Sequence, residues 1–208
     1  MEVAGKPIIQ WQIEWLKRYG LREIIVLGGY LYEKLIEFLG NGSRFGVRIA
    51  YVIEEEPLGT GGALKNAEHL LRVEDLFVVV NGDIITNLNP LRLVEVLRER
   101  SNVIAAMAAV PLRSPYGILD IDSEGYINAF IEKPLLKDYW INAGVYAMKP
   151  AILEYLPERG DIERSTFPRL AKERRMIALR YENVFWRSID TYKDVEEASK
   201  ELEEMQIL

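Results

Sequence analysis

The sequence has no cysteine and only one histidine, His69. Disulfide bonds and thiolate-bound metals are therefore excluded, and a single imidazole cannot form a histidine metal cluster. The chain likewise offers no Cys/His pair and no plausible Ser/His pair for nucleophilic catalysis. Any metal bound here must be held by oxygen ligands.

Long apolar runs and an excess of positive charge are also missing. No run is long enough to span a bilayer, and residues 1–7 lack the apolar core of a signal peptide. The 26 Lys and Arg residues are outnumbered by 32 Asp and Glu residues, and the net charge of -6 disfavours binding to a polyanion. We therefore expect a cytoplasmic protein that binds neither nucleic acid nor a membrane. The 208 residues, 49% of them hydrophobic, are enough for one domain over residues 1–208.

Helical and strand patterns alternate along the first half of the chain. Helical spacing predicts helices over residues 7–20, 32–39, 63–71 and 90–100, and β-branched or apolar runs predict strands over residues 24–27, 47–53, 76–80 and 103–110. This alternation predicts a Rossmann-like, doubly wound α/β sheet. The continuous apolar run at residues 76–80 predicts a strand buried on both faces of a parallel sheet.

The second half adds antiparallel strands. Two apolar runs, residues 118–121 and 126–132, flank the turn-forming residues 122–125 and predict a β-hairpin. A further strand is expected at residues 142–148, and helices at residues 150–156, 164–172 and 195–205. The sheet is therefore expected to be mixed.

Two loops that follow predicted strands carry candidate chemistry, because ligands bind beyond the carboxyl ends of strands in open α/β sheets. The loop that ends in Gly-Thr-Gly-Gly, residues 59–62, has glycines that let the backbone approach a flat ligand such as a base. The loop Asn-Gly-Asp, residues 81–83, places a carboxylate at the mouth of the sheet, where Mg²⁺ would share it with phosphate and water. Each motif alone is more typical of an ordinary polar or glycine-rich turn. Their occurrence together favours a nucleotide and a metal.

Six short motifs stand in the order and approximate spacing of the sugar-1-phosphate nucleotidyltransferases. They are PLGTGGAL at residues 57–64, NGD at 81–83, YG at 116–117, EKP at 132–134, INAGVY at 141–146 and FP at 167–168. Together they cover nearly the whole chain, which resembles the mannose-1-phosphate guanylyltransferases and the glucose-1-phosphate thymidylyl- or uridylyltransferases. The resemblance implies the nucleotide-diphospho-sugar transferase fold and the cofactor Mg²⁺. It also implies transfer of a nucleoside monophosphate from a nucleoside triphosphate to a sugar-1-phosphate, with release of pyrophosphate.

The resemblance further implies roles for the positions that match. For the nucleotide, Gly59, Thr60 and Gly61 would contact the base, Gly82 the ribose, and Asp83 the metal. The phosphate of the sugar substrate attacks the α-phosphorus, so no protein nucleophile is required, and catalysis comes from positioning and charge neutralisation.

The sugar phosphate is assigned its own set of residues by the same resemblance. Glu132 would accept hydrogen bonds from sugar hydroxyls, and Lys133 would neutralise the phosphate. Gly117, Asn142 and Gly144 would complete the sugar pocket. Taken singly, the Glu-Lys pair is also typical of a solvated strand end, and the asparagine of a turn cap. Lys133 and the metal-binding aspartate are the residues expected to act in catalysis.

The sequence departs from the family pattern in two places. Members begin with a strand and a glycine-rich Arg/Lys loop before the segment that matches residues 5–7, and we expect its absence to leave a hydrophobic slot or unpaired edges between the strands at 24–27 and 76–80. We expect those strands to close up, or another chain to fill the space. The second metal aspartate of the family falls at Ser188, and Asp190, which would share its strand face, is the candidate replacement.

Two hypotheses about function follow. The first is an active transferase whose true start lies upstream of Met1, or whose loop has been removed. The second is a catalytically silent homologue that binds nucleotide or sugar phosphate as a regulatory subunit. The base, the sugar and the formation of a homo-oligomer are left open by the sequence.

Overall fold

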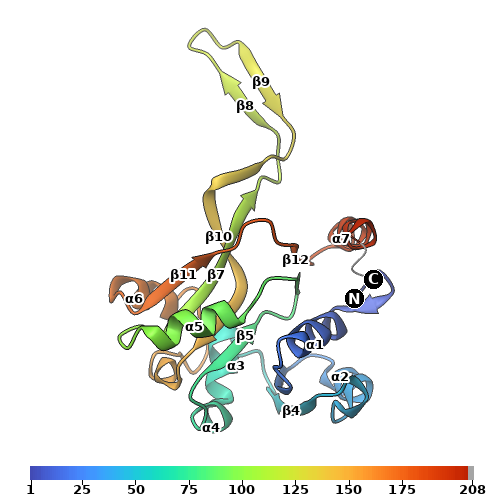
Figure 1. The fold of residues 1–208 in the computed structure, drawn as a ribbon, viewed down its shortest axis with the longest axis vertical. Helices are drawn as coiled ribbons and strands as arrows, with labels where there is room; N and C mark the ends of the chain where they lie inside the picture. Colours follow the sequence, from blue (N-terminus) through green and yellow to red (C-terminus); the bar gives the residue numbers. More distant parts are fainter. Residues whose placement is uncertain (206–208) are drawn as a thin grey trace.

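The protein is an α/β body from which one long two-stranded arm projects (Figure 1). The computed structural model describes residues 1–205. The helices are α1 Ile8–Arg18, α2 Tyr32–Leu39, α3 Gly59–Asn66, α4 Glu68–Leu71, α5 Leu91–Glu99, α6 Thr166–Lys172 and α7 Tyr192–Glu204, with short 3-10 helices at Ser43–Phe45 and Pro150–Glu154. The strands are β1 Glu2–Val3, β2 Lys6–Pro7, β3 Glu23–Gly28, β4 Arg48–Ile53, β5 Phe77–Val80, β6 Ile84–Thr86, β7 Ala105–Arg113, β8 Ile118–Ile121, β9 Ile127–Ile131, β10 Leu135–Met148, β11 Met176–Arg180 and β12 Trp186–Ser188. None of the helices within residues 1–205 is long and apolar enough to cross a membrane.

The central sheet is mixed, as the sequence predicts. Its strand order is β11-β7-β10-β5, with β11 parallel to β7 and β10 antiparallel to both of its neighbours. One prediction for it was wrong: β5 is an antiparallel edge strand with half-buried side chains, not a strand buried on both faces of a parallel sheet. The apolar run correctly indicated a strand, but such a run does not encode the direction of its partner.

Strand β10 forms the middle of the core because its two faces are both covered. Ala143, Val145 and Ala147 point into the cluster that contains α5, whereas Tyr146 and Met148 point into the cluster that contains α6. This alternation follows from the two-residue period of a strand. The helices therefore cover opposite faces of the central sheet, which is the layered arrangement expected for an α/β fold.

The strands β3 and β5 lie in separate sheets. Within residues 1–205, β3 pairs only with β4, in parallel, and β5 pairs only with β10. The expected unpaired edges are present, and the expected closing of the two strands onto each other was wrong. Filling of the space by another chain stays a prediction.

Helix α1 connects the parts of the body that no backbone ladder joins. Its Ile13 packs with Val26 of β3, and its Trp15 packs with Ile84 of β6 and donates from Nε1 to the Leu88 carbonyl at 2.8 Å. Trp11 and Trp15 are both buried, so the two tryptophans of this helix are packing residues. The helix therefore holds the β3–β4 pair against the rest of the body.

Several predicted element boundaries were wrong for local reasons. The helix predicted at residues 63–71 is two helices, and the first begins at Gly59, so the glycine segment is its first turn and not a loop before it. Residues 150–154 form a 3-10 helix, and β10 begins at Leu135 instead of residue 142. The strands β6 and β11 were not predicted, and the strand expected to carry both Ser188 and Asp190 ends at Ser188 as β12. Strands β6 and β12 have only three residues each, too few to show a period.

Candidate functional site

The turn that carries Asp83 follows β5, as the sequence predicts, and leads directly into β6. Strand β6 pairs antiparallel with β12, so that Ser188 lies opposite Ile84. The Ile189 amide also donates to the Asp83 carbonyl at 2.9 Å. These hydrogen bonds bring the C-terminal segment of the chain beside the aspartate.

Three oxygen atoms meet at this point. The Ser188 hydroxyl oxygen lies 2.9 Å from Oδ2 of Asp83 and 3.0 Å from Oδ2 of Asp190. A hydroxyl has one proton and can donate it to only one of the two carboxylates at a time. The two carboxylates therefore share a single donor, an arrangement that a cation would stabilise.

The donor set fits a hard cation such as Mg²⁺. Mg²⁺ prefers oxygen ligands and is usually bound through one or two carboxylates together with phosphate oxygens and water. No cluster of three or more His, Cys, Asp or Glu residues that could hold a metal occurs in residues 1–205, so phosphate and water would have to complete the coordination. Asp190 lies beyond the end of β12, so the reasoning from a shared strand face was wrong, although its carboxylate does reach Ser188.

Gln12 supports the Asp83 turn from α1. Its buried Nε2 donates to the Asn81 carbonyl at 2.8 Å and to the Ile84 carbonyl at 2.9 Å, one on each side of the aspartate. The sequence reasoning missed this residue. The signal that could have found it is a polar side chain on the apolar face of an amphipathic helix, because a buried amide must find partners.

Gln12→Met should lower the free energy of unfolding by about 1–2 kcal/mol, because it removes two hydrogen bonds while keeping a similar volume. The measurement is urea denaturation followed by circular dichroism. Gln10→Met is the matched control on the same helix, since the Gln10 amide contacts only the partly exposed Glu14 carboxylate. Equal losses in the two variants would contradict the role of Gln12.

A bulge in β10 touches the same turn. The register with β7 shifts between Asn142 and Tyr146, and the side-chain oxygen of Asn142 accepts from the Gly144 amide at 2.9 Å. The Gly144 carbonyl in turn accepts from the Asn81 amide at 2.8 Å. The structure thus brings Asn142 and Gly144, two residues expected in the sugar pocket, beside the turn of Asp83. The asparagine also caps the bulge, so both interpretations of this residue agree with the geometry.

Tyr146 lies between the two predicted nucleotide segments. Burial raises the pKa of its phenol to about 12, hydrogen bonds from Asn142 and Asn81 lower that pKa, and the charges of Glu163 and Asp83 raise it further. Asn142 Nδ2 donates to the phenol oxygen at 2.7 Å, and Glu163 accepts from the Thr60 hydroxyl at 2.7 Å. One buried hydroxyl is therefore influenced by the Asp83 turn and by the partner of Thr60.

The raised pKa of Tyr146 makes stability depend on pH in the alkaline range. Its stabilising contribution is complete below the ordinary tyrosine pKa of about 10 and is lost as the pH rises toward about 12. At pH 11, Tyr146→Phe should therefore lose about 1 kcal/mol less stability, relative to pH 9, than the parent protein does. The check is urea unfolding of both proteins at the two pH values. The same loss in both would show that this phenol ionises normally.

The glycine segment of α3 approaches protein backbone. The amides of Gly61 and Gly62 donate to the Gly160 carbonyl at 2.9 and 3.2 Å. A Cβ atom at Gly59 would lie 2.8 Å from the Gly160 carbonyl carbon, and one at Gly61 would lie 2.9 Å from its oxygen. The sequence predicted that these glycines let a ligand approach, whereas the structure shows that they let the loop at residues 157–161 approach. Contact of Gly59, Thr60 and Gly61 with a base stays a prediction.

Gly82 is the open position of the Asp83 turn. It is exposed, and a Cβ atom at this position would have no neighbour within 4 Å. The space beside its backbone can therefore receive a ligand. Its predicted contact with a ribose agrees with this geometry and stays a prediction.

The remaining sugar-site residues lie together at the base of the arm. A Cβ atom at Gly117 would lie 3.0 Å from Oε2 of Glu132, and Lys133 follows in the chain. The base begins at the hydrogen bond from the Ser114 amide to the Pro134 carbonyl. Ser114 is five residues beyond Ala109, the residue of β7 that pairs with Asn142. At about 3.3 Å per residue that separation is roughly 16 Å. The base of the arm thus lies further along the β7–β10 ribbon than Asn142, and the contacts of Gly117, Glu132 and Lys133 with a sugar phosphate stay predictions.

Comparison with known proteins agrees with the motifs. The family model described as nucleotidyl transferase matches residues 1–205. The mannose-1-phosphate guanyltransferase of Yarrowia lipolytica is 33% identical over 202 residues, which cover 93% of this chain and 55% of that protein. A UTP-glucose-1-phosphate uridylyltransferase of Synechocystis sp. is 30% identical over 186 residues, 81% of this chain and 48% of that protein. The chain spans about half the length of the curated relatives it matches.

Solved structures give the same result for the fold. The crystal structure of HddC from Yersinia pseudotuberculosis superposes with a TM-score of 0.74 at 25% identity, covering 97% of this chain and 88% of that chain. The same protein complexed with GMP-PN gives a TM-score of 0.73. A putative glucose-1-phosphate thymidylyltransferase from Bacillus anthracis, at 22% identity and a TM-score of 0.72, shares the fold.

Proposed function

Because the chain belongs to the nucleotidyl transferase family, we propose that it transfers a nucleoside monophosphate from a nucleoside triphosphate to a sugar-1-phosphate and releases pyrophosphate. The observation that carries the proposal is the meeting of Asp83, Ser188 and Asp190 beside the β10 bulge of Asn142. The names of the relatives make GTP with mannose-1-phosphate the first substrate pair to test, and UTP with glucose-1-phosphate the second.

In the proposed reaction, a phosphate oxygen of the sugar-1-phosphate forms a bond to the α-phosphorus of the nucleotide. The bond from that phosphorus to the oxygen bridging it to the β-phosphorus breaks, and pyrophosphate leaves. Mg²⁺, when bound by Asp83 and Asp190 with the Ser188 hydroxyl, supplies charge neutralisation for the phosphates. The chain supplies orientation: the exposed backbone of Gly82 leaves room for the nucleotide, and the bulge that Asn142 caps holds the turn through the Gly144 carbonyl.

Glu132 and Lys133 have an additional role in this proposal. They lie at the base of the arm, further along the β7–β10 ribbon than Asn142, where Glu132 would accept hydrogen bonds from the sugar hydroxyls and Lys133 would neutralise the phosphate. The proposal therefore rests on Asp83, Asn142 and Gly82, and the cationic role of Lys133 is an addition to it.

The proposal is tested by measuring pyrophosphate release from GTP, UTP and dTTP, each with mannose-1-phosphate and with glucose-1-phosphate. We expect release with at least one pair, dependent on Mg²⁺ and abolished by EDTA. Binding of a sugar nucleotide, measured by calorimetry, without any pyrophosphate release would replace the transferase with a silent binding subunit. Absence of both would overturn the assignment of the site.

A further inference from the structure

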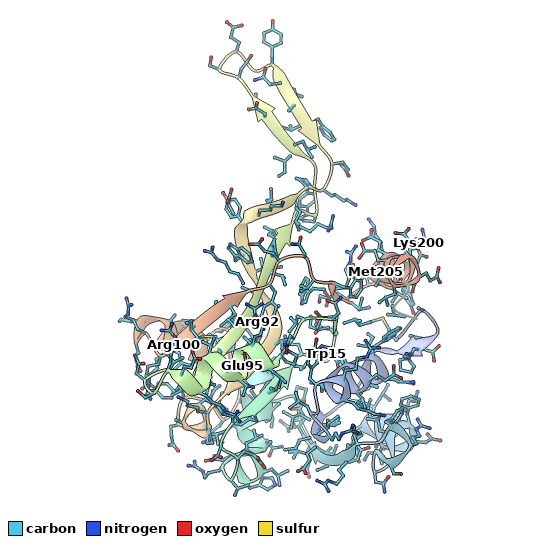
Figure 2. The ribbon with its side chains drawn as sticks, in the orientation of Figure 1. Trp15, Arg92, Glu95, Arg100, Lys200 and Met205 are labelled. Carbon is cyan, nitrogen blue, oxygen red and sulfur yellow. The ribbon has the colours of Figure 1, made fainter. Side chains whose placement is uncertain are left out.

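The arm formed by β8 and β9 carries an apolar face that the body does not cover. The antiparallel register pairs Leu119 with Phe130 and Ile121 with Ile127, so these four side chains share one face of the hairpin. Their exposed fractions are 43%, 64%, 55% and 60%. Figure 2 shows the side chains of the arm standing clear of the rest of the protein.

An uncovered arm of this kind needs a partner. A two-stranded hairpin is marginally stable by itself in water, because each strand has only one neighbour and its faces are solvated. Among residues 1–205, β8 and β9 pair only with each other. Among residues 1–205, most of the large apolar side chains that are exposed lie between residues 116 and 139. Such a concentration of exposed apolar surface is typical of a protein–protein contact.

Charge is segregated along the arm. Its outer part, residues 118–131, contains Asp120, Asp122 and Glu124 and no basic residue. Its base contains Arg113, Lys133 and Lys137, together with the acids Glu132 and Asp138. None of these charged residues forms an ion pair within the part of the chain that the structure describes, residues 1–205.

We propose that the arm docks against the arm of a second copy of this chain, apolar face to apolar face and in opposite directions. A two-fold contact requires a surface that complements itself. In this arrangement the apolar faces cover each other, and the acidic tip of each arm reaches the basic residues at the base of the other. A second copy thus covers the face that carries Leu119 and Phe130 and pairs the charged ends, while Ile118 and Ile131 lie on the opposite face.

The first test is the dependence of mass on protein concentration, measured by sedimentation equilibrium. The parent protein is expected to dimerise, and Ile127→Glu and Phe130→Glu are each expected to raise the dissociation constant at least about tenfold. Val73→Glu is the matched control, since Val73 is 80% exposed and lies outside the arm. The substituted positions are outside the buried core, so thermal unfolding should be nearly unchanged. The test needs no substrate, so its result is independent of the proposed transferase activity.

The second test determines the relative direction of the two arms. Because the sequence contains no cysteine, each introduced cysteine is the only thiol of its variant. Two single variants, Ser123→Cys at the tip and Lys137→Cys at the base, are oxidised separately and as an equimolar mixture. The mixture is expected to give far more disulfide-linked dimer than either variant alone, because tip meets base.

Three results would overturn the proposal. One is a parent protein that stays monomeric at every concentration measured. Another is a dimer whose dissociation constant the arm variants do not change, which would place the interface elsewhere. The last is equal cross-linking in the mixture and in the separate samples, which would exclude the opposed arrangement.

Discussion

Asp83→Asn should reduce Mg²⁺-dependent pyrophosphate release by about 10²–10³-fold, the loss typical of removing one group that stabilises charge in the transition state. The change replaces a carboxylate with a neutral amide at the point where the oxygens of Ser188 and Asp190 also meet. The quantity to measure is kcat at saturating substrates. The fold should be unaffected, because the side chain of Asp83 is half-exposed and its backbone hydrogen bond to Ile189 remains.

Two further variants separate the contribution of this carboxylate from general effects. Asp75→Asn changes an exposed aspartate outside the site and should leave kcat unchanged. Asp190→Asn should raise the Mg²⁺ concentration needed for half-maximal rate by about tenfold, which corresponds to a loss of about 1.4 kcal/mol of binding free energy. An unchanged Mg²⁺ requirement would show that Asp190 does not replace the aspartate expected at position 188.

Gly144→Ala should lower the free energy of unfolding by about 2–4 kcal/mol. One part of this loss comes from placing alanine in a left-handed backbone conformation, and the other from crowding of its Cβ atom. Gly144 has φ of +67°, and a Cβ atom there would lie 2.9 Å from Ile84 Cγ1 and 3.1 Å from the Asn81 side chain. Neither neighbour can move freely, because both belong to the turn of Asp83. Urea denaturation gives the value directly.

The glycines of this chain provide the controls for that experiment. Gly125→Ala meets the same backbone penalty, since φ is +91°, but has no neighbour within 4 Å and should cost only about 1–2 kcal/mol. Gly82→Ala has neither a positive φ nor a close neighbour and should be nearly neutral. If Gly144→Ala and Gly125→Ala lower the free energy of unfolding equally, the close contact with the Asp83 turn does not contribute to the loss of stability.

Most of the fold could be predicted because its helices carry their own signals. Helix α2 has the predicted bounds, and α1 and α5 lie within those predicted, because helical spacing and a terminal glycine or proline are local features. The direction of β5 could not be predicted, because an apolar run records burial and not the identity of the neighbour. The pairing of β6 with β12 joins segments about a hundred residues apart, which no local pattern encodes.

The candidate site was predicted in part for similar reasons. The place of Asp83 after β5 was predicted because the carboxylate directly follows an apolar run, and the family pattern indicated that position 188 belongs to the same site. Gln12 was missed, because its partners are backbone carbonyls that a sequence does not display. The place of Lys133 at the base of the arm was not predicted, because it depends on how far the β7–β10 ribbon carries the arm from the body.

The gap between β3 and β5 gives α1 a mechanical role. No ladder crosses the gap, so the β3–β4 pair is held to the body by side-chain packing: Ile13 of α1 packs with Val26, and Leu27 and Val52 pack against the cluster that contains Tyr146. The residue before Ile13 on the same helix is Gln12, which donates to the carbonyls on both sides of Asp83. Neighbouring residues of one helix thus anchor the detached strand pair and the carboxylate turn.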